Sequence, residues 1–129
     1  MSKVLIVKNK IKKFNKKINV SGDKSLSIRF VLIASQAVGK SKAYNLLMSE
    51  DVLAAIDSVK KLGIKVLINK NNCEVYGCGI NGFNYKKNLT LNAKNSGTLG
   101  RLLLGLLIKS PQKIKLIGDK SLSKRDFSR

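Results

Sequence analysis

The chain has 129 residues, with 26 Lys and Arg against 7 Asp and Glu, so that its formal net charge is +19. Hydrophobic residues make up 43% of the sequence, which is enough for one folded domain but, at this length, not for two independent cores. No apolar run approaches the roughly 20 residues that cross a bilayer, and the start of the chain has no signal-peptide pattern, so we expect a cytoplasmic protein without a membrane partner.

The positive charge invites comparison with nucleic-acid-binding proteins, but its distribution is not typical of them. Lysines are scattered along the whole chain, arginines number only four, and aromatic residues make up 5%. Dedicated nucleic-acid binders more often concentrate Arg in an arm or interleave it with stacking aromatics. We therefore expect no nucleic-acid partner and a basic surface that attracts small anions.

Cys73 and Cys78 are the two cysteines, and the chain has no histidine. This leaves too few ligands for a zinc site, so no metal is expected. The residues favour free thiols in a reducing compartment over a local disulfide.

The first predicted elements are two short strands, at 3–8 and 16–20, followed by a helix over 24–38. Gly39 is expected to end this helix. Four of its apolar residues fall near one face and are predicted to form its buried side: Leu26, Phe30, Ile33 and Ala37.

A strand-like segment at 41–47 leads into the clearest helix, over 49–63. Ser49 is its predicted cap, acidic residues complement its positive end, lysines its negative end, and Gly63 ends it. The remaining elements are a hairpin, then a strand, a helix and a strand, at 64–69, 73–77, 89–93, 96–110 and 113–118. This order describes an α/β protein whose helices cover a mixed sheet.

The octapeptide GDKSLSIR at 22–29 recurs as GDKSLSKR at 118–125 with a single change. In both places a predicted strand ends, a Gly-Asp turn follows, and Lys-Ser opens a helix, where unpaired backbone N–H groups and the helix dipole favour an anion. Lys24 and Ser25 add an ammonium and a hydroxyl, and Arg29, one turn further, adds a two-pronged donor for phosphate or carboxylate. A plain turn with a capping residue is the alternative, but two copies at equivalent junctions favour an anion cradle.

A third junction of the same kind is NAKNSGTLGR at 92–101. Asn95 and Ser96 precede a helix, Gly97 permits a ligand to approach the backbone closely, and Arg101 lies in the first turn. The alternative is a capped core helix with a solvated Arg101. Three such openings together predict one site for a ligand with more than one anionic group.

The tripeptide Gly-Lys-Ser at 39–41 is not a nucleotide-binding phosphate loop. That motif requires a glycine five residues before its second glycine, and Ala34 stands there. The tripeptide also follows a predicted helix rather than a strand.

Taken together and in this order, the motifs resemble those of EPSP synthase, the 3-phosphoshikimate 1-carboxyvinyltransferase of the shikimate pathway of aromatic amino acid biosynthesis. GDKSLSIR resembles the family's G-[DS]-K-S-x-S-x-R motif, and LLMSEDVLAAIDSVKKLGIKV resembles its L-x-S-x-D helix. NSGTLGRLL resembles its N-[SA]-G-T-x-x-R motif, and GDKSLSKR its G-D-x-S-L-x-x-R segment. Four ordered motifs are a specific signal where any one would be weak.

The resemblance implies βαβαββ units of the inside-out α/β barrel of enolpyruvyl transferases, incomplete in this chain. Residues 1–20 would form an N-terminal strand segment. Residues 21–129 would form the first βαβαββ unit and the start of the second, within one domain. The match covers only the beginning of the family's chain, so the remainder of the enzyme would be needed to complete the site.

The resemblance also implies the substrates, shikimate 3-phosphate and phosphoenolpyruvate, without a cofactor or a metal. A shikimate hydroxyl adds to the central carbon of phosphoenolpyruvate, the methylene carbon is protonated, and the adduct loses phosphate. The residues implied for shikimate 3-phosphate are Lys24, Ser25 and Arg29. Those implied for phosphoenolpyruvate are Lys24, Asn95, Gly97 and Arg125, with Asp51 and Arg101 in support. Lys24 is also the implied catalytic residue, and we expect no turnover from this chain alone.

Two positions depart from the family pattern: Ser21 stands where Pro is usual, and Arg-Asp-Phe at 125–127 replaces Arg-Pro-Met. Three other interpretations stay open at this point. One is a relative of UDP-N-acetylglucosamine enolpyruvyl transferase, which shares the chemistry but not these motifs. The others are a basic anion- or RNA-binding module without catalysis, and a truncated gene product without activity.

Overall fold

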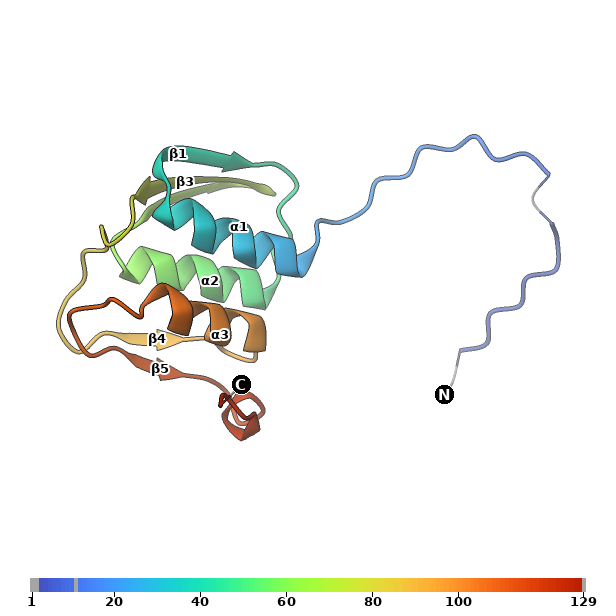
Figure 1. Cartoon of the computed structure of the whole chain (residues 1–129). Helices are drawn as coiled ribbons and strands as arrows, with labels where there is room; N and C mark the ends of the chain where they lie inside the picture. The colour runs from blue at the N-terminus through green and yellow to red at the C-terminus, as the bar shows by residue number, and fades with distance from the viewer. Residues whose placement is uncertain (1–2, 11, 129) are drawn as a thin grey trace.

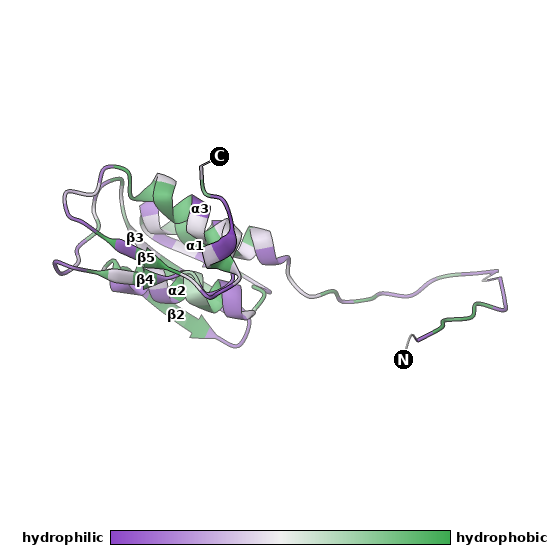
Figure 2. Cartoon of the chain, turned by 90° about the horizontal axis from the view of Figure 1, so that it is seen from below, coloured by the Kyte–Doolittle hydropathy of each residue, from purple (hydrophilic) through white to green (hydrophobic). Residues whose placement is uncertain are grey.

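The computed structural model describes residues 3–10 and 12–128, and Figure 1 shows an extended N-terminal arm leading into a folded body. The predicted strands at 3–8 and 16–20 are wrong, because residues 3–10 and 12–23 contain no strand. No strand of the described chain lies beside them, so their backbone groups have no ladder partners. Apolar and polar stretches follow one another along the arm (Figure 2), and apolar side chains such as Val4 and Leu5 are 80% and 89% exposed.

Three helices form the middle of the body, and each begins at a residue suited to capping. They are α1 (Lys24–Gln36), α2 (Glu50–Lys61) and α3 (Gly97–Leu106). Their N-cap residues are Asp23, Ser49 and Ser96. None of the helices in the described part of the chain is long and apolar enough to span a bilayer.

The strands form two separate sheets on opposite sides of the helices (Figure 1). The larger sheet is antiparallel, in the order β1-β3-β2: β1 (Val38–Ala43), β3 (Asn72–Cys78) and β2 (Lys65–Asn69). The smaller is a parallel pair, β4 (Thr90–Asn92) and β5 (Lys115–Ile117), followed by a short 3₁₀ helix η1 (Leu122–Lys124). The predicted hairpin is confirmed as β2 and β3, but the predicted mixed sheet is replaced by these two sheets.

The buried face of α1 differs from the predicted one. Leu26 and Ile33 are 67% and 69% exposed, and the helix buries a stripe one position away: Ser27, Ile28, Val31, Leu32, Ala34 and Ser35. The serines fit this face because their hydroxyls donate back to carbonyls within the helix region, from Ser27 to Asp23 at 2.6 Å and from Ser35 to Leu32 at 2.6 Å.

Gly39 was predicted to end α1, but this prediction is wrong. Gly39 lies inside β1 with a φ of +90°. The helix ends two residues earlier because Ala37 is extended and its N–H donates to the Ala34 carbonyl. Both cysteines are free thiols, as expected. Burial raises the pKa of the Cys73 thiol, whereas Cys78 is exposed.

Strand β3 passes so close to the end of α1 that only glycine fits at position 77. A Cβ there would lie 2.2 Å from the carbonyl oxygen of Ala34 and 2.3 Å from that of Ala37. We expect Gly77→Ala to lower the free energy of unfolding in urea by about 1–3 kcal/mol through this overlap.

Gly105→Ala, in α3, is the matched control because a Cβ at Gly105 would meet no atom within 4 Å. It should raise the free energy of unfolding by about 0.5–1 kcal/mol through helix propensity. Equal effects from the two substitutions would contradict the packing of β3 against α1.

Candidate functional site

All three helices run in the same direction, so their N-termini lie at one end of the body (Figure 1). Each N-terminus carries unpaired backbone N–H groups and the positive end of a helix dipole. The sequence motifs at 22–29 and 92–101 therefore meet at this end, where a shared anion site was predicted. Aligned dipoles alone favour an anion, and the side chains add charge and shape to that preference.

At the start of α1, Asp23 caps the helix by accepting from the N–H of Leu26 at 2.7 Å. Lys24 extends across to α2, where its Nζ lies 3.0 Å from the carboxylate of Asp51. Asp51 lies in the first turn of α2, so the ion pair joins the two helix starts. The Lys24 side chain is 53% exposed, which leaves its ammonium accessible to a ligand.

Ser25 is half-buried and Arg29 is exposed, one turn further along α1. No ion pair or hydrogen bond joins Arg29 to another of the described residues. Ser49 occupies the N-cap position of α2 as predicted, but its buried hydroxyl makes no capping bond and finds no partner in the described chain.

At the start of α3, Ser96 caps the helix by accepting from the N–H of Leu99 at 3.3 Å. Arg125 donates to the side-chain oxygen of the neighbouring Asn95 at 2.8 Å. The guanidinium lies over Gly97, where an added Cβ would be 2.7 Å from one of its nitrogens. Gly97 thus leaves room for Arg125 at the helix start.

The second octapeptide opens the short 3₁₀ helix η1 rather than the predicted α-helix. Its turn nevertheless repeats the first: Asp119 accepts from the N–H of Leu122 at 2.7 Å, and the hydroxyl of Ser123 donates to the Asp119 carbonyl at 2.8 Å. Asp23 and Ser27 make the same two bonds in the first copy. The helix ends early because Arg125 is extended, which directs its side chain toward Asn95.

Arg101 is turned toward the end of the described chain rather than toward the helix start. Its guanidinium donates to the carbonyl of Asp126 at 2.6 Å and lies 5.0 Å from the ring centre of Phe127. The Asp126 carboxylate accepts from the N–H of Ser128 at 2.8 Å, and hydrogen bonding from Ser128 holds the pKa of that carboxyl below its usual value. Phe127 was not among the predicted site residues, and its only signal in the sequence was the departure from Arg-Pro-Met at 125–127.

The predicted residues therefore form two groups at the same end of the helices. One contains Lys24, Ser25 and Arg29 on α1 with Asp51 on α2, and the other contains Asn95, Gly97 and Arg125. Within the described residues, no ion pair or hydrogen bond links the two groups directly. A ligand with two anionic groups would be needed to contact both.

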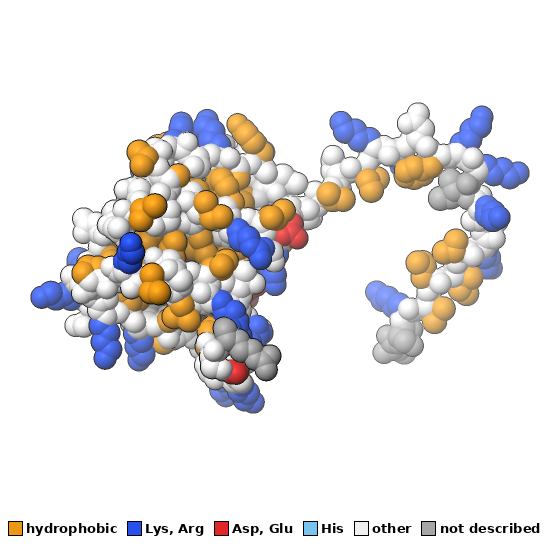
Figure 3. All heavy atoms as spheres, in the orientation of Figure 1, with side chains coloured by type: hydrophobic (Ala, Val, Ile, Leu, Met, Phe, Trp, Pro, Cys, Tyr) orange, Lys and Arg blue, Asp and Glu red, His pale blue; other side chains and the backbone are white. Residues whose placement is uncertain are grey.

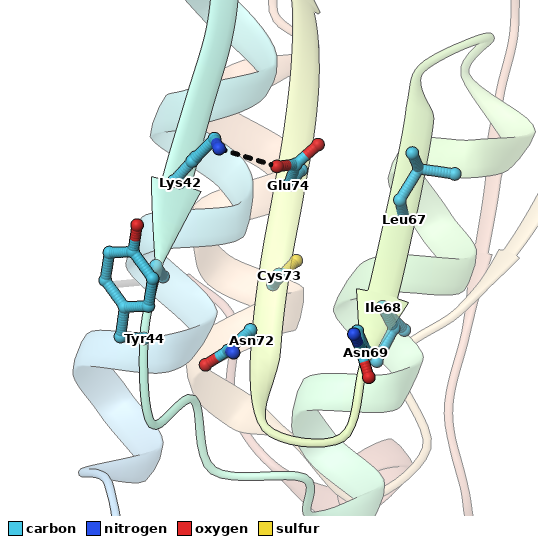
Figure 4. A pocket seen from close by; sticks show the side chains of 9 residues that line it. Lys42, Tyr44, Leu67, Ile68, Asn69, Asn72, Cys73 and Glu74 are labelled. Atoms are coloured by element: carbon cyan, nitrogen blue, oxygen red, sulfur yellow. Dashed lines mark ion pairs between the residues drawn. The ribbon is translucent and has the colours of Figure 1, made fainter.

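A hollow of about 300 Å³ lies on the face of the larger sheet that points away from the helices (Figure 4). Its two charged lining residues already neutralise each other, since the Nζ of Lys42 lies 3.0 Å from the carboxylate of Glu74. The hydrogen bond from Lys42 holds the pKa of Glu74 below its usual value. This hollow is separated from the helix starts by the sheet and contains none of the predicted site residues.

Comparison with known proteins agrees with this arrangement. The family model of EPSP synthase (3-phosphoshikimate 1-carboxyvinyltransferase) matches residues 8–129. The chain belongs to the EPSP synthase family. The resemblance read from the four motifs is thereby confirmed.

Curated relatives include the 3-phosphoshikimate 1-carboxyvinyltransferase of Streptococcus pyogenes serotype M1, which is 42% identical over 112 residues. That match covers 87% of this chain and 26% of the relative. The enzyme of the same name from Bacillus cytotoxicus is 40% identical over 118 residues, covering 92% of this chain and 28% of the relative. This EPSP synthase family chain thus spans about a quarter of the length of these relatives.

A solved structure of EPSP synthase from Acinetobacter baumannii superposes with a TM-score of 0.75 at 35% sequence identity. The match covers 85% of this chain and 25% of that one. The predicted fold class is confirmed: the chain is an incomplete portion of the enolpyruvyl transferase α/β fold.

The capping bond of Asp23 gives the first octapeptide a structural role that can be measured separately from binding. Asp23→Ala removes the acceptor for the Leu26 N–H and should lower the free energy of unfolding by about 1 kcal/mol. Asp23→Asn keeps a side-chain oxygen and should stay within about 0.5 kcal/mol of the unchanged chain, since Asn and Asp cap about equally well. Urea unfolding followed by circular dichroism measures both, and an equal loss in the two variants would exclude capping as the cause.

Proposed function

We propose that this chain contributes part of the site at which the enolpyruvyl group is transferred from phosphoenolpyruvate to shikimate 3-phosphate, giving 5-enolpyruvylshikimate 3-phosphate and phosphate. The observation that carries the proposal is the gathering of three helix N-termini at one end, with cationic side chains on two of the neighbouring segments. Both substrates carry several negative charges and repel each other. An array of fixed donors and cations holds such a pair together and stabilises charge as it moves.

Each group at the helix starts has a proposed ligand. Ser25 and Arg29 receive shikimate 3-phosphate, for which Arg29 offers a guanidinium without a partner among the described residues, able to make two parallel hydrogen bonds. Asn95, Gly97 and Arg125 receive phosphoenolpyruvate, for which Gly97 leaves room for the Arg125 guanidinium over the start of α3. Lys24 belongs to the first group. From the N-terminus of α1 its ammonium would contact both substrates.

The reaction needs one proton delivered to the methylene carbon of phosphoenolpyruvate as the shikimate hydroxyl oxygen bonds to its central carbon. The hydroxyl gives up its own proton as it adds. The methyl group formed by the protonation then loses a proton as phosphate leaves, which restores the C=CH₂ double bond of the enolpyruvyl group. Lys24 is the proposed proton carrier in this chain, and Asp51 holds its ammonium in place at 3.0 Å.

Four of the five carboxylates near the helix starts have other partners. Asp23 and Asp119 cap helices, Asp51 pairs with Lys24, and Asp126 accepts from Ser128. The fifth, Glu50, is exposed in the first turn of α2. We therefore propose that the remainder of the enzyme supplies the missing acid and base, and that this chain alone binds without turnover.

The order of elements supports the proposed domain division. Residues 21–129 contribute α1, β1, α2, β2 and β3, followed by β4, α3 and β5, which fits the later part of one βαβαββ unit and the start of a second. The free thiols agree with action in a reducing compartment such as the cytoplasm.

Removal of the Lys24 ammonium should weaken phosphoenolpyruvate binding. Lys24→Met loses a charge-assisted contact, so we expect the dissociation constant measured by calorimetry to rise about tenfold or more. Lys61→Met is the matched control, because Lys61 also pairs with an aspartate, Asp57, at 2.9 Å but lies in the last turn of α2. Equal losses from the two substitutions would indicate attraction by overall charge and contradict a site at the helix starts.

The chain supplied with both substrates should release no phosphate above the rate of the Lys24→Met variant. A coupled phosphate assay at steady state measures this directly. Release that exceeds the Lys24→Met rate would show that the described residues suffice for catalysis and would contradict the need for the remainder of the enzyme.

A basic module that binds RNA is the competing function, and Figure 3 shows lysines and arginines spread over the visible face and the arm rather than gathered in one stripe. Binding to a polyanion such as poly(U) would fall steeply with salt. Salt-dependent polyanion binding without any heat of binding for shikimate 3-phosphate would favour that function over the transferase.

A further inference from the structure

The segment after β5 folds back over the start of α3 and is held there at two points on either side of Arg125. Before Arg125, the side chain of Leu122 is 3% exposed and packs so closely that a Cβ at Gly118 would lie 2.4 Å from it. After Arg125, the ring of Phe127 lies on Gly100, where an added Cβ would be 3.2 Å from the ring. The backbone that carries Arg125 is therefore fixed from both directions.

Arg101 strengthens the second of these points. Its guanidinium contacts the Phe127 ring, with a distance of 5.0 Å to the ring centre, and donates to the Asp126 carbonyl at 2.6 Å. The two contacts bind the residues directly after Arg125 to the first turns of α3. Gly100 has no side chain that would displace the ring, and the guanidinium of Arg101 lies over the ring.

The side chain of Arg125 itself is exposed and, among the described residues, has one hydrogen bond, to Asn95. An exposed arginine samples many rotamers, and this bond can form only while the backbone of Arg125 stays within reach of Asn95. The position of the guanidinium over Gly97 therefore depends on where Phe127 and Arg101 place the chain.

We propose that Phe127 is a positioning residue, which holds Arg125 over the start of α3 so that its guanidinium faces the phosphoenolpyruvate site. Phe127 acts with Arg101 and does not touch the ligand. The proposal rests on the proposed function for the identity of the ligand, but the order of the Arg125 side chain can be measured without any ligand.

The first measurement is the {¹H}-¹⁵N heteronuclear NOE of the Arg125 Nε–H in the free 129-residue chain. We expect a value near that of the folded backbone in the unchanged chain and a fall toward the value of a freely rotating side chain in Phe127→Ala. Phe127→Met, which restores an apolar contact on Gly100, should recover the ordered value. Phe14→Ala is the matched control, because Phe14 lies in the N-terminal arm and is 68% exposed.

The second measurement is the affinity for phosphoenolpyruvate in a double-mutant cycle. Phe127→Ala should weaken binding about three- to tenfold, the cost of ordering one long side chain on binding. In an Arg125→Ala background the same substitution should have no further effect, because its action passes through Arg125. A general loss of structure would weaken binding equally in both backgrounds.

An ordered Arg125 in Phe127→Ala, or equal losses in the two backgrounds of the cycle, would overturn the proposal. Should the unchanged chain bind no phosphoenolpyruvate, the proposed function fails. The Nε–H measurement then decides by itself whether Phe127 positions Arg125.

Discussion

The candidate site depends on one constraint, which is that three helices pack side by side in the same direction. Parallel dipoles repel one another where they lie close, so this arrangement carries an electrostatic cost at its N-terminal end. Burial of the apolar faces of α1, α2 and α3 between the two sheets offsets that cost. The ion pair of Lys24 and Asp51 also lowers the cost, because the Asp51 carboxylate lies in the first turn of α2, at the positive end of the helix dipole. A bound anion would lower the remaining repulsion between the positive helix ends. The electrostatic cost of the fold is therefore what favours the proposed ligand.

The repeated octapeptide forms the same capped turn in both copies, but the turn opens an α-helix in one copy and a short 3₁₀ helix in the other. In both copies the aspartate and the second serine make the same turn, with bonds of 2.6 to 2.8 Å to nearby backbone groups. Only the first copy continues into an α-helix. In the second copy the 3₁₀ helix ends after one short turn because Arg125 has an extended backbone. The turn is thus encoded by neighbouring residues, whereas the direction of Lys24 and Arg125 is set by contacts with α2 and α3. Similar sequences therefore place Lys24 in the first turn of its own helix α1, and Arg125 beside the start of a different helix, α3.

Elements whose signals are local were predictable from the sequence. Helix α2 has its acidic first turn, basic last turn and terminal glycine, and the hairpin of β2 and β3 is marked by two apolar runs around a short polar turn. Predictions failed where a distant partner decides the outcome. The arm at 3–10 and 12–20 has strand-like residues but no strand beside it among the described residues, and the buried stripe of α1 includes Ser27, whose hydroxyl accepts from the N–H of the distant Leu47 at 3.0 Å. The pairing of Arg125 with Asn95 and the packing of Phe127 on Gly100 join positions 27 to 30 residues apart, so spacing alone could not reveal them.

The arrangement of charge, more than its amount, distinguishes the helix starts from the rest of this basic chain. On the outer sheet face, Lys40 and Lys42 share Glu74, so one carboxylate balances one of the two positive charges there. At the helix starts Asp23 is used for capping and Asp51 for a single ion pair, and Arg29 has no partner among the described residues. A diffuse surface charge is weakened by salt over a distance of about 10 Å, whereas donors fixed at a helix start contact an anion directly and are screened much less. The helix starts therefore keep their attraction for a small anion at salt concentrations that suppress the diffuse attraction of the rest of the surface.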